Sequence, residues 1–202
     1  QEMAKVIQQK EPSLGTQNTI TRMQMGNLDD IRNGALTTNI EFVVYYVAGV
    51  AQYNQANYLK SIVHFSKTIS LKPDDVSGYF SRGNAYYSQQ EYAQAIIDYN
   101  KAIELDPKYA AAYNNRGLAY ANQQEYAQAI ADYNKAIELD TNYATAYYNR
   151  GLAYYSQQEY AKAIADYNKS IKLDPNDAKA YYNRGNAYYS QQEYAQAIID
   201  YN

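Results

Sequence analysis

The chain repeats itself every 34 residues, and this period decides its fold class. The pair Arg-Gly recurs at that spacing, at Arg82-Gly83, Arg116-Gly117, Arg150-Gly151 and Arg184-Gly185. The flanking sequence recurs as well, as SRGNAYYSQQEYAQAIIDYN in the first of these copies and NRGNAYYSQQEYAQAIIDYN in the last. A unit of this length cannot bury its apolar face alone and must stack on its neighbours. The sequence therefore predicts an array of stacked repeats.

Each repeat contains two stretches of helical periodicity. In the copy that begins at Val76, small and aromatic residues follow a 3.6-residue period over 76–89 and again over 92–105. Pro107 ends the second stretch, since proline disfavours helix in the residue before it. Gly83 lies inside the first stretch, where glycine costs about 1 kcal/mol relative to alanine. We therefore expect two paired helices in close contact at Gly83, opposite Ala95.

These residues resemble the tetratricopeptide repeat (TPR), in which aromatic and small residues recur over 34 positions. In the copy that begins at Val76, the matching residues are Tyr79, Gly83, Tyr86, Ala95, Tyr99, Ala102 and Pro107. Tyrosine stands where the family often has tryptophan, in accord with 27 Tyr and no Trp in the chain. The resemblance implies an all-α fold, a right-handed superhelical solenoid of antiparallel helix pairs.

The repeat divides the chain into an array and a segment before it. The array is expected over 42–202, with a degenerate repeat at 42–75, full repeats at 76–109, 110–143 and 144–177, and a truncated repeat at 178–202. Residues 1–41 do not fit the pattern, and are interpreted either as an N-terminal helical cap or as the remnant of a preceding domain. The last repeat stops inside its second helix, so an open end that stacks head to tail on another copy is one expectation. Truncation of a longer chain is the other.

Composition argues against most other function classes. The net charge is −3, so no basic field attracts nucleic acid. No apolar run is long enough for insertion into a membrane. With no cysteine and one histidine, neither a nucleophilic triad nor a histidine-rich metal site can be assembled. We expect no enzyme activity, no cofactor and no bound metal.

A recurring arginine and a recurring aspartate are expected to form structural ion pairs between the two helices of a repeat. The two residues are separated by 16 positions in the four later repeats, and in the degenerate repeat both are replaced, by Ala48 and His64. Buried charges are normally paired, which favours ion pairing over the capture of an acidic ligand. The predicted pairs are Arg82 with Asp98, Arg116 with Asp132, Arg150 with Asp166, and Arg184 with Asp200.

Repeats of this family present their first helices on a concave face, and the side opposite the packing stripe would therefore meet a ligand. An asparagine row on that side could hydrogen-bond a peptide backbone, and resembles the asparagine ladder of the O-linked GlcNAc transferases. An aromatic row would give contact area at low entropic cost. The alternative is that asparagine tolerates a solvated face and tyrosine packs on the next repeat. The candidate ligand-binding residues are Asn84, Asn115, Asn149, Asn183, Phe80, Tyr148, Tyr182, Tyr87, Tyr155, Tyr189 and Lys179.

The expected partner is therefore a protein or a peptide. Family members that bind chaperone tails hold the terminal carboxylate with a clamp of Lys, Arg and Asn. Here Asn84 and Asn115 match the asparagines of the clamp, but Phe80, Thr145 and Asn149 stand at its basic places. A chaperone tail is not expected, and the nearly neutral face favours an uncharged or mildly basic segment. The alternatives are a self-assembling structural subunit and the regulatory arm of a larger enzyme or signalling protein.

Overall fold

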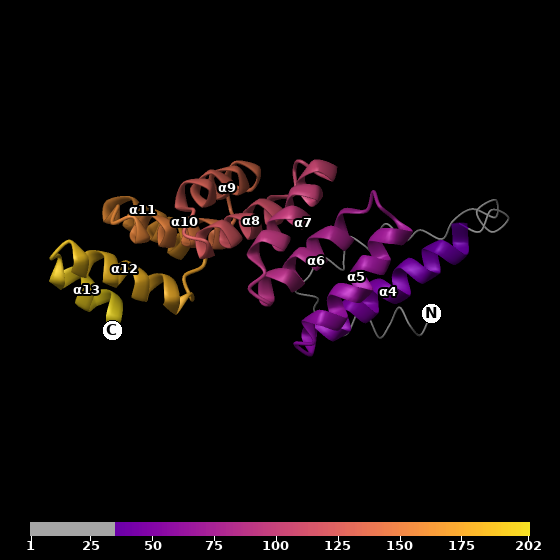
Figure 1. Ribbon diagram of the computed structural model, residues 1–202. Coiled ribbons are helices and arrows are strands. Elements are labelled where there is room, and N and C mark those ends of the chain that lie inside the picture. Colours follow the sequence, from indigo (N-terminus) through magenta and orange to yellow (C-terminus); the bar gives the residue numbers. More distant parts are fainter. Residues whose placement is uncertain (1–34) are drawn as a thin grey trace. The chain divides into compact units, whose positions relative to one another are not determined.

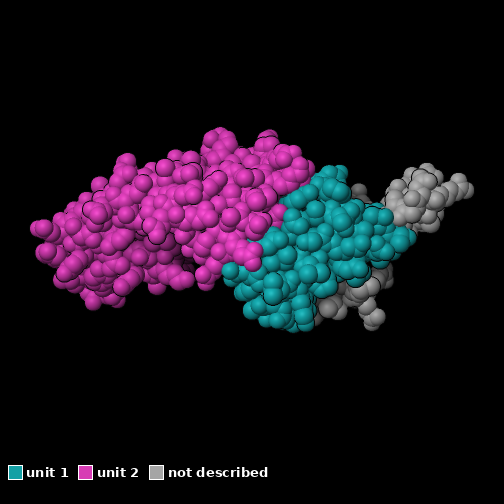
Figure 2. All heavy atoms as spheres, in the orientation of Figure 1, with its two compact units in different colours: residues 1–89 teal, residues 90–202 magenta. Residues whose placement is uncertain are grey.

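The computed structural model describes residues 35–202, and all ten elements in that range are α-helices (Figure 1). Of the predicted cap or remnant at 1–41, residues 1–34 lie outside the described residues. The chain divides into two compact units, residues 1–89 and residues 90–202 (Figure 2). The predicted all-α fold is confirmed.

The described part of the first unit consists of three helices, α4 (Ala35–Asn54), α5 (Tyr58–Leu71) and α6 (Val76–Ser88). Aromatic rings make its core: Phe42 stacks on Tyr46 with ring centroids 6.2 Å apart, and Tyr46 contacts Phe65 at 5.7 Å. Helix α6 begins where it does because the side chain of Asp75 accepts a hydrogen bond from the backbone N–H of Ser77, at 2.9 Å.

The second unit consists of seven consecutive helices, which are α7 (Tyr92–Leu105), α8 (Ala110–Asn122), α9 (Tyr126–Leu139), α10 (Ala144–Ser156), α11 (Tyr160–Leu173), α12 (Ala178–Ser190) and α13 (Tyr194–Tyr201). Each repeat contributes two neighbouring helices that pack on each other: α8 with α9, α10 with α11, and α12 with α13 (Figure 1). We call these the first and second helix of a repeat. The predicted antiparallel helix pairs are thereby confirmed.

The two helices of a repeat meet where a glycine faces a tyrosine ring. The rings of Tyr133 and Tyr167 are fully buried. A Cβ atom added to Gly117 would lie 2.7 Å from Cε1 of Tyr133. In this unit the close neighbour of the glycine is therefore the tyrosine, whereas the sequence led us to expect the alanine of the second helix. The alanine of the second helix, such as Ala129, is also buried and belongs to the same core cluster as the ring of Tyr133.

A Schellman motif ends each first helix and turns the chain into the second. After α8, the N–H of Glu125 donates to the carbonyl of Tyr120 and the N–H of Gln124 to that of Ala121, both at 2.9 Å. The motif requires a left-handed residue, and Gln124 adopts φ 64°. Gln158 and Gln192 repeat this conformation, with φ 61° and 65°. The polar turn predicted from the sequence therefore has a fixed geometry.

Candidate binding surface of the first helices

The predicted ligand-binding residues of the second unit lie on the first helices α8, α10 and α12. We call this the first-helix surface. It consists of the side chains Asn114, Asn115, Leu118, Ala121, Asn122, Tyr148, Asn149, Leu152, Tyr155, Ser156, Lys179, Tyr182, Asn183, Asn186, Tyr189 and Ser190. Lys179, Tyr182 and Tyr189 are exposed, whereas Asn114 and Asn149 are buried.

Side-chain hydrogen bonds join successive first helices across this surface. The amide of Asn149 donates to Oδ1 of Asn114 at 2.9 Å, and the amide of Asn183 donates to the hydroxyl of Tyr148 at 2.9 Å. Both bonds connect residues 35 positions apart. Two members of the predicted asparagine row therefore help to hold one repeat on the next. A role for them in binding a peptide stays a prediction.

The same register occurs in the first unit, between α4 and α6. There the hydroxyl of Tyr46 lies 3.3 Å from Oγ of Ser81. The two candidate residues Phe80 and Asn84 of α6 are buried, each 7% exposed, and Tyr87 is half-buried. Burial of this kind suits packing, so contact of Phe80 and Asn84 with a ligand also stays a prediction.

A second tyrosine of the first helix also reaches the next repeat. The hydroxyl of Tyr155 lies 3.3 Å from Oγ of Ser190, and its ring meets that of Tyr160 with centroids 5.3 Å apart. In the first unit, Tyr53 contacts Ser88 at 3.0 Å and the ring of Tyr58 at 5.4 Å. The tyrosine, the serine 35 residues later and the ring five residues later therefore form a recurring contact.

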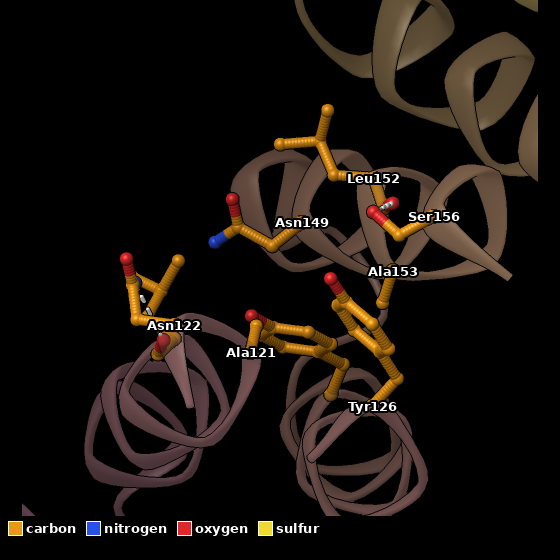
Figure 3. Close-up of a pocket in the computed structure, with 9 residues that line it drawn as sticks. Ala121, Asn122, Tyr126, Asn149, Leu152, Ala153 and Ser156 are labelled. Carbon is orange, nitrogen blue, oxygen red and sulfur yellow. Dashed lines mark hydrogen bonds between the residues drawn. The ribbon is translucent and has the colours of Figure 1, made fainter. Parts of the chain in front are cut away.

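A pocket of about 200 Å³ opens between α8, α9 and α10 (Figure 3). Its lining combines apolar side chains with amide and hydroxyl groups and carries no ionisable acid or base except the phenols of two tyrosines. The lining residues are Leu118, Ala121, Asn122, Tyr126, Tyr133, Asn149, Leu152, Ala153 and Ser156. A concave site with a few polar groups is the usual form of a ligand pocket. Sequence reasoning did not predict it, although Ala121 breaks the run of tyrosines at its position in the repeat.

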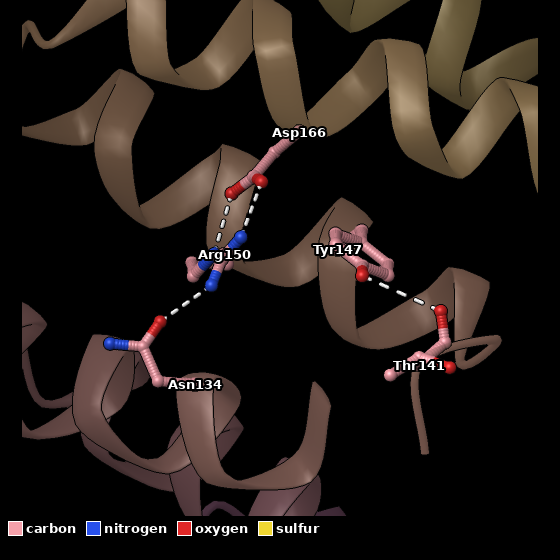
Figure 4. Close-up of polar contacts among 5 residues, drawn as sticks. All are labelled: Asn134, Thr141, Tyr147, Arg150 and Asp166. Carbon is pink, nitrogen blue, oxygen red and sulfur yellow. Dashed lines mark hydrogen bonds and ion pairs between the residues drawn. The ribbon is translucent and has the colours of Figure 1, made fainter. Parts of the chain in front are cut away.

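The recurring charges form bidentate ion pairs between the first and the second helix of a repeat. Nε and Nη2 of Arg150 donate to the two carboxylate oxygens of Asp166, at 2.7 and 2.6 Å (Figure 4). The Asp166 side chain is 8% exposed and that of Arg150 is 18% exposed. Hydrogen bonding to Asp166, opposed by burial, raises the pKa of Arg150 above its ordinary value. The ion pair therefore favours the charged form of the arginine.

The arginine also holds a third helix. Nη1 of Arg150 donates to Oδ1 of Asn134 at 2.6 Å, and Asn134 belongs to α9 of the preceding repeat (Figure 4). The pairs Arg116 with Asp132 and Arg184 with Asp200 have the same bidentate geometry. Their third contacts are Asn100 at 2.6 Å and Asn168 at 2.5 Å. Each arginine thus ties together both helices of its repeat and the second helix of the repeat before it.

The two residues of the first copy of the charged pair, Arg82 and Asp98, belong to different units. Arg82 donates to Oγ of Ser66 at 3.0 Å, and Ser66 occupies the place that asparagine has in the later repeats. Asp98 is buried, at 2% exposure. The pairing of Arg82 with Asp98 stays a prediction.

The described residues hold no group of three or more His, Cys, Asp or Glu side chains arranged to bind a metal ion. None of the helices within 35–202 is both long and apolar enough to cross a bilayer.

Comparison with known proteins identifies the family. The crystal structure of MamA protein is 30% identical, covers 80% of this chain and 88% of its own, and has a TM-score of 0.71. The first TPR domain of Spaghetti (RPAP3), bound to an HSP90 peptide, is 30% identical over 58% of this chain and 93% of its own, with a TM-score of 0.57. PilF of Pseudomonas aeruginosa shares the fold, at 22% identity, coverage of 82% and 75%, and a TM-score of 0.74. No curated protein sequence matches significantly.

A sequence model described as the TPR repeat matches residues 83–124, 120–158 and 151–192, which together make up more than half of the chain. The chain therefore belongs to the tetratricopeptide repeat family, whose fold is that of a non-catalytic scaffold for protein–protein interaction.

Proposed function

We propose that the chain binds an extended segment of a partner protein along the first-helix surface. The observation that carries this proposal is the pocket between α8 and α10 (Figure 3). It opens among residues of that surface, where Asn149, Leu152 and Ser156 of one repeat meet Leu118 and Asn122 of the preceding one. An apolar pocket beside amide groups offers anchorage for a side chain and hydrogen bonds for a backbone.

The charge of the surface favours an uncharged or mildly basic segment. The side chains of the first-helix surface include one ionised group, Lys179. The pocket lining is neutral. The first TPR domain of RPAP3 binds the HSP90 peptide SRMEEVD, which is acidic. The basic residues of a carboxylate clamp are incomplete here, so the proposed ligand differs in chemistry from that peptide.

In the proposed complex, the peptide follows the first helices from α8 towards α12. Within this unit, Asn115, Asn149 and Asn183 of the asparagine row would contact the peptide backbone. Of the aromatic row, Tyr148, Tyr155, Tyr182 and Tyr189 would contact its side chains, with Lys179 beside them. Of these, Tyr182 and Tyr189 are 59% and 60% exposed and so offer the largest accessible ring area.

The test uses an array of unrelated ten-residue peptides and titration of every bound peptide in solution. Two variants with matched chemistry locate the site: Asn122→Arg at the pocket rim, and Ala131→Arg on the second helix α9, both at exposed positions. We expect Asn122→Arg to weaken binding at least tenfold and Ala131→Arg to leave it unchanged. Equal effects of the two variants, or no peptide that binds, would overturn the proposal. Sedimentation velocity of each protein checks that self-association does not mask the surface.

A further inference from the structure

The pocket lies where one tyrosine of the repeat is missing. The twelfth position of the five repeats holds Tyr53, Tyr87, Ala121, Tyr155 and Tyr189. Only at Ala121 is the ring replaced by a methyl group. The pocket of about 200 Å³ opens at that residue. The cavity therefore lies at the place that a tyrosine ring occupies in the other four repeats.

The contacts of Tyr155 show how a phenol ring is held at the equivalent place of the next repeat, and we use them as a template for a ligand in the pocket. Oγ of Ser190 donates its hydrogen to the carbonyl of Asn186 at 2.9 Å, so the Tyr155 hydroxyl, 3.3 Å away, is the donor to Ser190. The ring of Tyr155 meets that of Tyr160 at an interplanar angle of 59°. Tilted pairs of this kind are favoured by the charge distribution of aromatic rings.

Both partners of the template are present at the pocket, without the ring between them. Tyr126 stands in the place of Tyr160, and Ser156 stands in the place of Ser190. Oγ of Ser156 donates to the carbonyl of Leu152 at 3.0 Å, so its oxygen is disposed to accept a hydrogen bond (Figure 3). A cavity of about 150 Å³ already accommodates benzene. The larger volume here suffices for a ring with one hydroxyl.

We infer that the pocket binds a 4-hydroxyphenyl group, supplied by a tyrosine of the partner segment. Its ring packs against the edge of Tyr126 and its hydroxyl donates to Ser156. The neutral lining disfavours a carboxylate or an ammonium group, whose burial without a partner is costly. That the ring belongs to a bound peptide rests on the function proposed above. Binding of a free phenol in the pocket does not depend on that function.

The probe is p-cresol, which is the tyrosine side chain alone. Binding is followed through the NMR signals of the chain and through the dependence of the melting temperature on p-cresol concentration. We expect saturable binding, with the largest signal changes at Tyr126 and Ser156. Toluene, which lacks the hydroxyl, should bind about fivefold more weakly, the net value of one hydrogen bond. Signal changes elsewhere, or no saturation, would overturn the inference.

Three variants make the assignment specific. Ala121→Tyr fills the pocket and should abolish p-cresol binding; the circular dichroism spectrum checks that this variant folds. Ser156→Ala, at an exposed position, should reduce the affinity for p-cresol to that for toluene. Tyr155→Ala should open a second pocket between Ser190 and Tyr160 and so create a second p-cresol site. If Ala121→Tyr binds p-cresol as well as the natural chain does, the pocket is not the site.

Peptides separate this inference from the proposed function. Replacing tyrosine by alanine in a bound peptide should cost affinity on the natural chain and none on Ala121→Tyr. If peptides bind and p-cresol does not, the inference fails while the proposed surface stands. If p-cresol binds and no peptide does, the pocket is real and the proposed function fails.

Discussion

A Cβ atom on Gly151 would lie 2.7 Å from Cε1 of Tyr167, closer than real side chains pack. Both residues are buried, and the ring of Tyr167 is held by neighbouring side chains including Tyr148, with ring centroids 6.0 Å apart. The ring therefore cannot move away at low cost. The same relation joins Gly117 to Tyr133 and Gly185 to Tyr201. This contact explains why the first helix keeps a residue that is a poor helix former.

We therefore expect Gly151→Ala to destabilise the chain. Alanine gains about 1 kcal/mol of helix propensity, but overpacking costs about 1–3 kcal/mol, so the expected net loss is about 1 kcal/mol. Urea unfolding measures it. The double variant Gly151→Ala with Tyr167→Leu removes the ring that would clash, and its loss should be smaller than the sum of the two single losses. Additive losses would mean that the ring does not require the glycine.

Because the Arg150–Asp166 pair is largely buried, we expect Arg150→Met to lower the stability strongly, and the equivalent substitution in an exposed ion pair to lower it little. Arg150→Met leaves the carboxylate of Asp166 buried and unpaired, which costs about 3 kcal/mol. It also removes the bond to Asn134, so the contact with the preceding repeat is weakened too. Differential scanning calorimetry should record a clear fall in the melting temperature.

The control for this prediction is the exposed pair Lys135 with Glu138, whose side chains are 38% and 68% exposed. Exposed pairs contribute little, since water and salt screen them. Lys135→Met should leave the melting temperature nearly unchanged. The double variant Arg150→Met with Asp166→Leu should recover part of the loss, because no uncompensated charge remains. A loss in the double variant as large as in Arg150→Met would contradict the buried-charge explanation.

The helices could be predicted from the sequence almost to the residue. The periodic stretches 76–89 and 92–105 correspond to α6, Val76–Ser88, and α7, Tyr92–Leu105. Their boundaries are clear because strong periodicity is interrupted by a polar turn and by proline. The left-handed glutamine in the turn was not predicted, since glycine is the usual residue at that place.

Contacts between repeats could not be read from the sequence. The asparagine row looked like a surface for ligands, yet the amide of Asn149 donates to Asn114 of the preceding repeat. The step of 35 residues, one more than the repeat, follows from how neighbouring first helices lie side by side, which periodicity does not reveal. The pocket exists because Ala121 lacks the ring that tyrosine has at this position. Only the structure shows which residues surround the equivalent ring of Tyr155, and therefore which residues line the space left at Ala121. The recurring sequence did contain the signal, as the one break in a column of tyrosines.

The buried hydroxyl of Tyr167 leads to a stabilising substitution. Among the described residues it has no hydrogen-bond partner. A buried group in this state costs about 1–3 kcal/mol. Tyr167→Phe keeps the ring that packs on Gly151 and should raise the free energy of unfolding by about 1 kcal/mol. A lower free energy of unfolding would mean that a bound water satisfies the hydroxyl.

The same residue makes stability depend on alkaline pH. Burial, with a smaller contribution from Tyr148, raises the pKa of Tyr167 above its ordinary value. The folded chain therefore retains a proton that the unfolded chain releases above about pH 10. The stability is fully present below that pH and falls as the pH rises further. Tyr167→Phe should flatten this decline, as measured by urea unfolding at pH 9 to 11.

The turn after α10 offers a stabilising substitution that touches no core residue. Gln158 adopts φ 61°, a left-handed conformation that costs a residue with a Cβ atom roughly 1 kcal/mol and costs glycine little. Gln158→Gly should therefore raise the free energy of unfolding by up to about 1 kcal/mol, as measured by urea unfolding. The neighbouring Gln157, with φ −87°, is the matched control. There glycine gains nothing in the folded state and frees the unfolded chain, so Gln157→Gly should destabilise. If both substitutions destabilise equally, the left-handed turn does not strain the chain.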